Sequence, residues 1–450
     1  MAEDIRLLAL ETLLEAEKLN MFVKDALHRT LTMKQFLSKQ DRAFLTRLVS
    51  GVTEYRIRLD YILNSFSKTR MEKCKPVIRN LLRMGAYQLV FMDSIPAAAA
   101  CSESVRLAKK KGFGNLSGFV NGVLRSTARG LDTVAYPQEE REYLSIWYSI
   151  PRWLTDCLIE WYGIERTKAY LEASVRPSGL TIRVNTAHVT PEELTGRLQA
   201  TGVEVSPGKY VRYALRLSNM NYVNRLPGFR EGDFFVQDES SMLVYELAGL
   251  DQLHWEGKLR VIDLCAAPGG KCTHFAQKLG DRVQILAGDR TEKKVSMIRE
   301  NIERLGLTQI EVRSWDARNM DPALLEWADV VIADLPCSGL GILSKKSDIK
   351  YHMGREQLDE LVTLQRQILG TAASYVRPGG MLIYSTCTVN PSENVENARW
   401  LTENYPFKED SVMEFLPEPL RQYVENDSML QLVPGEVECD GFFIARFRRN

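Results

Sequence analysis

Two cysteines in this sequence each follow a predicted strand and lie in a short polar turn. Cys337 belongs to the run DLPCSG at residues 334–339, and Cys387 to the run STCT at residues 385–388. A cysteine thiolate is a strong nucleophile, so a thiol in such a turn can carry out covalent catalysis. One cysteine at a strand end is more often a small buried residue. Two of them in polar turns of one domain indicate catalytic thiols, with Asp334 as the neighbouring acid, although the pattern does not rank the two sulfurs.

A glycine-rich turn upstream has the character of a ligand-binding loop. It is the run DLCAAPGGK at residues 263–271, which begins within the apolar strand 261–264. Small residues and two glycines let a ligand approach the backbone, and the next helix presents N–H groups at its start. Asp289 closes the second strand, where it can accept hydrogen bonds from ribose hydroxyls, which favours a nucleoside over a bare phosphate. The predicted cofactor-binding residues of the turn are Cys265, Ala266, Ala267, Pro268, Gly269, Gly270 and Lys271.

The scaffold that must hold these turns is predicted over residues 236–450. Apolar strands alternate with helical stretches there, and the strands are expected at 261–264, 284–289, 310–312, 330–334 and 381–385. Such alternation predicts a parallel α/β sheet covered by helices on both faces. Ligands of these sheets lie at the carboxyl ends of the strands, which is where both cysteine turns are expected.

Residues 1–130 have a different pattern and charge. Apolar residues recur every three to four positions, as at Leu45, Leu48, Val49 and Val52, which predicts an all-α bundle. This stretch holds 22 Lys and Arg against 12 Asp and Glu, a balance of +10, whereas the whole chain balances at zero. A basic end joined to an acidic body indicates an electrostatic platform for phosphates, with the solvated helical surface as the alternative.

Between these two regions, residues 145–235 predict a small α+β subdomain. Strands are expected at 179–185, 203–205 and 213–217, and a helix opens at Thr190-Pro191. The predicted domains are therefore 1–130, 145–235 and 236–450.

No apolar run approaches the roughly 18–20 residues that span a bilayer. With acidic residues at the start of the chain and scattered cysteines that lack zinc-site spacing, we expect a cytoplasmic protein without a metal.

The catalytic motifs resemble those of the RNA cytosine-5 methyltransferases, the RsmB/NOP2/Sun family. The run AAPGGK with Asp289 downstream is similar to motif I of that family, which implies S-adenosylmethionine as the cofactor and Asp316 as the adenine contact. The pair of cysteines is also typical of the RNA enzymes. The resemblance implies that Cys387 attacks the cytosine, that Cys337 assists release of the product, and that Asp334 both lies at the cofactor site and hydrogen-bonds the base near N3.

The resemblance covers nearly the whole chain. IPAA at 95–98 and FVNGVLR at 119–125 are similar to the NusB-type RNA-binding domain, and VQDESS at 236–241 and DGFFIA at 440–445 also fit the family. The chain departs from the family pattern in two places. Ser347 stands where the family usually has proline, and residues 437–439 form a variable stretch. A NusB-like bundle before this core implies 16S (small-subunit) rRNA as the partner, bound by a monomer. Candidate phosphate contacts are Lys109, Lys110, Lys111, Arg125 and Arg129.

Three other interpretations remain open from the sequence. The core does not distinguish a tRNA methyltransferase from an rRNA one. An RNA-binding antitermination or assembly factor with a non-catalytic methyltransferase fold is expected to lack one of the cysteines or the glycine pair, and all are present. A DNA cytosine methyltransferase is disfavoured by the Thr386-Cys387-Thr388 turn and by the helical extension.

Overall fold

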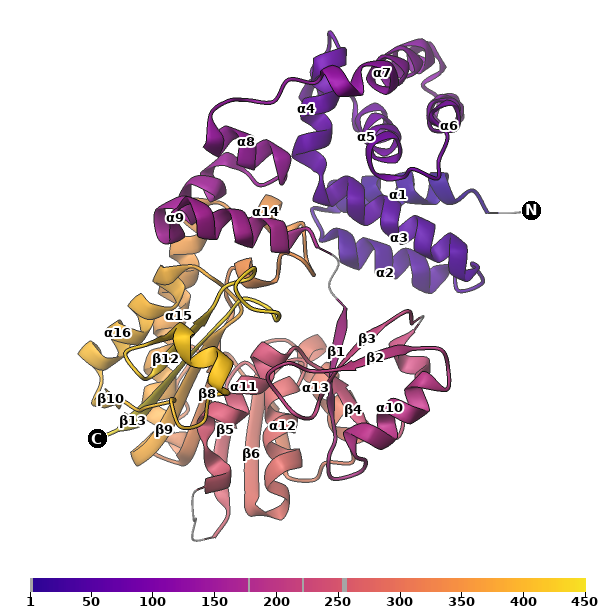
Figure 1. Cartoon of the computed structure of the whole chain (residues 1–450). Coiled ribbons are helices and arrows are strands. Elements are labelled where there is room, and N and C mark those ends of the chain that lie inside the picture. Colours follow the sequence, from indigo (N-terminus) through magenta and orange to yellow (C-terminus); the bar gives the residue numbers. More distant parts are fainter. Residues whose placement is uncertain (1–2, 177–178, 221, 253–256) are drawn as a thin grey trace. The chain divides into compact units, whose positions relative to one another are not determined.

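The computed structural model describes residues 3–176, 179–220, 222–252 and 257–450 (Figure 1). It divides into two compact units: unit 1 comprises Met1–Val175 and Leu343–His352, and unit 2 comprises Arg176–Ile342 and Met353–Asn450. No helix in the described ranges is long and apolar enough to cross a membrane. The division near residue 175 falls within the predicted 145–235 subdomain, and the predicted limits at 130, 145 and 235 stay predictions.

Unit 1 is built from helices, which confirms the predicted all-α bundle. Its core is a continuous cluster of buried side chains that includes Leu10, Leu48, Leu81 and Leu124. These residues recur at helical spacing, so each helix turns one apolar face inward. The helices are α1 (Ile5–Leu19), α2 (Val23–Met33), α3 (Lys39–Glu54), α4 (Arg56–Phe66), α5 (Pro76–Phe91), α6 (Ala97–Lys110), α7 (Ser117–Gly130), α8 (Glu140–Trp147) and α9 (Arg152–Ser174).

A segment far along the chain completes unit 1. We call residues 343–352 the strap; it contains the short helix α14 (Ile349–His352). Lys350 is buried, and its Nζ donates to the backbone oxygen of Glu54 at 2.9 Å. The Tyr351 hydroxyl donates to the carbonyl of Ser149 at 3.1 Å. Burial lowers the pKa of Lys350 to about 7. The strap is therefore held by buried contacts rather than lying loosely on the surface.

Unit 2 opens with a small antiparallel sheet in the order β2-β3-β1-β4. Helix α10 begins where a helix was predicted to open, and Thr190 caps it: its side chain accepts from the Glu193 backbone while Glu193 reaches back to Thr190. The elements are β1 (Leu180–Val184), α10 (Pro191–Gln199), β2 (Glu204–Pro207), β3 (Ala214–Ser218) and β4 (Phe234–Val236). The predicted α+β character of this region is confirmed.

The rest of unit 2 is a mixed sheet in the order β11-β12-β13-β9-β8-β5-β6-β7, with β10 paired to β13. The strands β5 to β9 are parallel, as predicted, and β13 runs antiparallel to β9. The elements are α11 (Glu239–Ala248), β5 (Leu259–Asp263), α12 (Gly270–Leu279), β6 (Val283–Asp289), α13 (Glu292–Arg304), β7 (Ile310–Ser314), β8 (Ala328–Asp334), α15 (Arg355–Tyr375), β9 (Val376–Thr386), α16 (Val395–Asn404), β10 (Phe407–Glu409), β11 (Val424–Glu425), β12 (Met429–Leu432) and β13 (Phe442–Arg449).

Successive side chains of the central strand β5 pack into two different hydrophobic cores. Val261 packs in one cluster with Phe275 of α12 and Ile298 of α13. Ile262 packs in another with Leu369 of α15 and residues of α16. Because side chains alternate across a strand, helices cover both faces of the sheet. The ends of the strands are therefore where a ligand site can form.

Candidate active site

The parallel pairing of β8 with β9 brings the two predicted cysteines together. Asp334, the last residue of β8, lies opposite Ser385 of β9. Each turn leaves the sheet just beyond this pair, so Cys337 and Cys387 reach the same place. Their sulfur atoms are 3.3 Å apart, and both thiols are free and partly exposed. Fifty residues of sequence thus separate two sulfurs that are in direct contact.

A network of polar contacts holds the two cysteine turns against each other. The hydroxyls of Ser338 and Thr388 are 2.6 Å apart. The Glu393 carboxylate is fully buried; its Oε2 accepts from the Ser338 backbone N–H at 2.8 Å, and its Oε1 accepts from Asn390 Nδ2 at 3.0 Å. Gln365 Nε2 donates to Glu393 Oε2 at 2.9 Å. One carboxylate therefore contacts residues on both turns.

The surroundings of Cys337 favour its protonated form. The hydrogen bond with Cys387 raises the pKa of the Cys337 thiol well above its usual value, and burial and the negative charges of Cys387 and Glu393 act in the same direction. A thiol that keeps its proton is a poor nucleophile.

Asp334 lies between the cysteine turns and the glycine-rich turn. Its Oδ2 accepts from Lys271 Nζ at 2.6 Å, and its Oδ1 accepts from Ser385 Oγ at 2.8 Å. Lys271 belongs to the first turn of α12, and its Nζ also donates to Ser241 Oγ at 3.1 Å. This ion pair fixes the end of β8 to the start of α12 and places Asp334 beside both candidate sites.

The glycine-rich turn joins β5 to α12 and contains most of the predicted cofactor residues. Gly269 has φ = 105°, a left-handed conformation that favours glycine, and its N–H donates to the Ala266 carbonyl at 2.6 Å. Asp289 Oδ2 accepts from the Ala267 N–H at 3.2 Å, so the end of β6 supports the turn directly. The remaining members, Cys265, Pro268, Gly270 and Lys271, lie on the same turn or at the start of α12.

Asp316 follows β7 and is partly exposed. Arg318 binds its carboxylate in a fork, with Nε to Oδ1 at 2.9 Å and Nη2 to Oδ2 at 2.5 Å. The Arg318 side chain holds the pKa of Asp316 down at about 2. Asp316 is thus an anion whose two oxygens already have donors, and an adenine contact requires it to share one of them.

Comparisons with known proteins agree with this geometry. A family model described as 16S rRNA methyltransferase RsmB/F matches residues 252–448, a NusB family model matches 3–129, and a RsmF/B-like ferredoxin-like domain matches 150–224. "Probable ribosomal RNA small subunit methyltransferase B" of Bacillus subtilis is 35% identical over 99% of both chains. Ribosomal RNA small subunit methyltransferase B of Vibrio cholerae is 32% identical over 92% of this chain and 90% of its own. The chain belongs to the RsmB/F methyltransferase family.

Solved structures show the same fold. The crystal structure of PH0851 is 24% identical and covers all of both chains with a TM-score of 0.82. A methyltransferase homologue from Pyrococcus horikoshii is 25% identical and covers 70% of this chain and all of its own, with a TM-score of 0.58. As a member of the RsmB/F family, the chain uses S-adenosylmethionine as its cofactor.

The residues at the ends of β5 and β6 fit that cofactor. S-adenosylmethionine carries hydrogen-bond donors in its ribose hydroxyls and its ammonium group. Asp263 is fully buried, its Oδ2 accepts from the Cys272 N–H at 3.2 Å, and its Oδ1 has no partner within the described ranges. Burial raises the pKa of Asp263 to about 7. An unpartnered acceptor beside the glycine-rich turn, with Asp289 nearby, suits a ligand that brings donors.

Two buried groups of this RsmB/F site were missed by the sequence analysis. One is Glu393, whose signal was an acid six positions after Cys387 in the same polar run. The other is Arg183 of β1, a lone arginine in an otherwise apolar strand. It is fully buried, its Nη1 donates to the Gly270 carbonyl at 2.7 Å and its Nη2 to Thr273 Oγ1 at 3.0 Å. The small sheet thus contributes a side chain that supports the start of α12.

Glu393→Gln is expected to loosen the cysteine turns. The amide replaces one carboxylate oxygen by an NH2 group that faces backbone or side-chain donors, so buried hydrogen bonds are lost. We expect a decrease of about 2–4 kcal/mol in the free energy of unfolding and a roughly tenfold decrease in methyl transfer. Urea unfolding and a methylation assay measure the two effects. Glu396→Gln, on an exposed residue of α16, is the matched control, and equal behaviour of the two variants would contradict this role for Glu393.

Proposed function

We propose that this chain methylates carbon 5 of a cytosine in 16S rRNA through a covalent adduct between Cys387 and carbon 6 of the base. The observation that carries the proposal is the contact of two free thiols, 3.3 Å apart, at the ends of adjacent parallel strands. Asp334 connects these strands to the glycine-rich turn of the cofactor site. A methyl donor site beside a thiol pair is what cytosine C5 methylation requires, because C5 is a poor nucleophile until C6 carries a sulfur.

The proposed reaction conserves every atom and electron pair. The Cys387 sulfur donates an electron pair to form the S–C6 bond, and the electrons of the C5–C6 double bond make C5 nucleophilic. C5 takes up the methyl group of S-adenosylmethionine, whose S–CH3 bond breaks with its electron pair staying on the sulfur, so that S-adenosylhomocysteine leaves. A base then removes the C5 proton, the C5–C6 double bond forms again, and the S–C6 bond breaks with its electron pair returning to Cys387. The net change replaces C5–H by C5–CH3 and releases one proton.

The environment of Cys337 suits the role of releasing the product. Two of the influences that raise its pKa, the hydrogen bond with Cys387 and the charge on that sulfur, come from a sulfur that is bonded to carbon in the adduct. Cys337 therefore loses its proton more readily after attack than before it, so it can act as the base at C5. We assign Asp334 to the cytosine near N3, where its carboxylate can stabilise the adduct.

We propose that Asp289 binds the ribose hydroxyls of the cofactor and that Asp316 contacts its adenine. We also assign the glycine-rich turn, residues 265–271, to the binding of the rest of the cofactor. The choice of 16S rRNA rests on the small-subunit methyltransferase names of the relatives and on the NusB family match over residues 3–129. We propose that the protein acts in the cytoplasm as a monomer.

Release of tritium from RNA labelled at C5 of cytidine tests the position of methylation. With [¹⁴C-methyl]-S-adenosylmethionine present, we expect one tritium released for each methyl group incorporated into 16S rRNA, because the C5 proton must leave. A parallel reaction at low salt uses tRNA as the comparison substrate. Methyl incorporation without tritium release would place the methyl group on another atom and reject the C5 assignment.

A further inference from the structure

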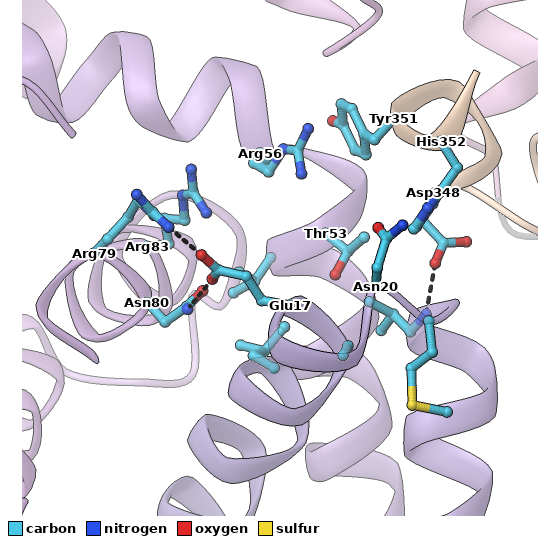
Figure 2. A pocket seen from close by; sticks show the side chains of 15 residues that line it. Glu17, Asn20, Thr53, Arg56, Arg79, Asn80, Arg83, Asp348, Tyr351 and His352 are labelled. Carbon is cyan, nitrogen blue, oxygen red and sulfur yellow. Dashed lines mark hydrogen bonds and ion pairs between the residues drawn. The ribbon is translucent and has the colours of Figure 1, made fainter. Parts of the chain in front are cut away.

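Unit 1 contains a cavity of about 330 Å³ outside the cysteine site (Figure 2). The end of α1, the starts of α2, α4 and α5, and the strap all contribute to its wall. Its volume lies at the small end of the range of about 300–1,000 Å³ that is usual for ligand pockets. Its lining includes the apolar side chains of Leu13 and Val52 and three arginines, Arg56, Arg79 and Arg83.

Most charges around the cavity are already compensated. Glu17 forms an ion pair with Arg79 and accepts from Asn80 Nδ2 at 3.0 Å. Asp60 binds Arg83 in a fork at 2.7 and 2.6 Å. Asp348 of the strap accepts from the Val23 N–H, at the start of α2, at 2.6 Å. Each carboxylate on or behind the wall thus faces its own donor.

Arg56 is the exception. Its guanidinium lies over the ring of Tyr351, 3.6 Å from the ring centre, and within the described residues it forms no salt bridge with a carboxylate. An aromatic face attracts a cation but does not neutralise it. Burial lowers the pKa of Arg56, yet an arginine stays charged at neutral pH. A partly desolvated cation beside a cavity is unfavourable until an anion approaches it.

A second arginine of the same wall also has an unused donor. Arg79 Nε is buried and has no hydrogen-bond partner in the described part of the chain. Thr53, Asn20 and His352 add polar groups to the lining. The Arg56 cation and several polar groups around one cavity match the needs of a phosphate, which accepts several hydrogen bonds and carries negative charge.

We propose that this cavity binds a backbone phosphate of the RNA substrate, with Arg56 as its main ligand. The proposal rests on the proposed function for the choice of RNA as the source of the phosphate. The apolar residues in the lining suit the attached sugar better than a second phosphate. Because the strap supplies Asp348, Tyr351 and His352 to the wall, the site requires a segment that follows Cys337 closely in the chain.

Arg56→Gln tests the site through the salt dependence of RNA binding. Affinity for protein-free 16S rRNA is measured without S-adenosylmethionine over a range of KCl concentrations. Loss of one phosphate contact is expected to weaken binding about tenfold and to reduce the slope of log K against log [salt] by about 0.7. Arg29→Gln, an exposed arginine of α2 paired with Glu15, removes the same charge and is expected to leave the slope unchanged. Equal slopes and affinities for the two variants would overturn the proposal.

Further arms identify the anion and check the fold. Arg56→Lys keeps the positive charge but loses the forked guanidinium. We expect this variant to retain the salt slope of the original protein and to recover part of the RNA affinity. It replaces Arg56→Gln as the test if Arg56→Gln does not fold. A second experiment measures the melting temperature with inorganic phosphate present. If phosphate raises the melting temperature of the original protein but not of Arg56→Gln, and the two bind RNA equally well, a small anion occupies the cavity and the RNA assignment is rejected. Since binding is measured without the cofactor, a failed tritium-release assay and a failed binding assay are distinguishable.

Discussion

Cys337→Ala is expected to accumulate a covalent protein–RNA adduct that survives denaturing gel electrophoresis. In this variant Cys387 is intact, so the S–C6 bond still forms and C5 still accepts the methyl group. The C5 proton then lacks the thiol that lies 3.3 Å from the attacking sulfur, so release is slow. We expect turnover to decrease about 100-fold or more, with a shifted band of labelled RNA as the measurement.

Two controls make this adduct specific. Cys439→Ala removes a partly buried thiol outside both turns and is expected to turn over normally without a shifted band. The double variant Cys337→Ala, Cys387→Ala is expected to form no adduct. A shifted band with Cys387→Ala alone would reverse the roles of the two sulfurs.

Cys387→Ala is expected to reduce methyl transfer by at least about 10³-fold. Without its sulfur no adduct can form, and C5 remains a poor nucleophile. Burial and the charge of Glu393 still raise the pKa of the Cys337 thiol in this variant, so Cys337 is not expected to substitute as the nucleophile. Methyl incorporation and tritium release, measured on protein with an unchanged melting temperature, check this result. Residual activity within tenfold of the original would contradict the assignment of Cys387 as the nucleophile.

The framework of the candidate site was predictable because the strands themselves, and the residues at which they end, follow from local pattern. Asp334 and Ser385 each end an apolar run, and parallel strands bring their carboxyl ends to one edge. The contact between Cys337 and Cys387 then follows once β8 and β9 are neighbours. The pairing of β8 with β9 is itself a property of the whole sheet, and short-range periodicity in the sequence does not encode it.

Groups that act through long-range contacts were not predictable in the same way. Glu393 becomes a buried acceptor only because Ser338 and Gln365, distant in sequence, point their donors at it. The antiparallel strand β13 pairs with β9 across more than fifty residues, and the strap belongs to unit 1 although it lies within the catalytic region of the sequence. Each depends on tertiary packing rather than on local propensity.

Charge in the sequence was informative as a total but not residue by residue. The excess of basic residues over 1–130 indicated a phosphate partner. In the structure, Lys110 and Lys111 of the predicted phosphate-contacting run form ion pairs with Asp4 and Glu11. Arg56, which belongs to no basic run, lies at the cavity and forms no salt bridge with a carboxylate among the residues that the structure describes. The contacts of the lysine run and of Arg125 and Arg129 with RNA stay predictions.

Bisulfite mapping of 16S rRNA tests the central claim most directly. Protein-free 16S rRNA and assembled small subunits are each incubated with the protein and S-adenosylmethionine, treated with bisulfite and sequenced. We expect a single cytosine to become protected from conversion, and we expect the protection to be absent with Cys387→Ala. No protected cytosine in either form of the rRNA, under conditions where the protein binds the cofactor, would contradict the proposal that this chain is a 16S rRNA cytosine-5 methyltransferase.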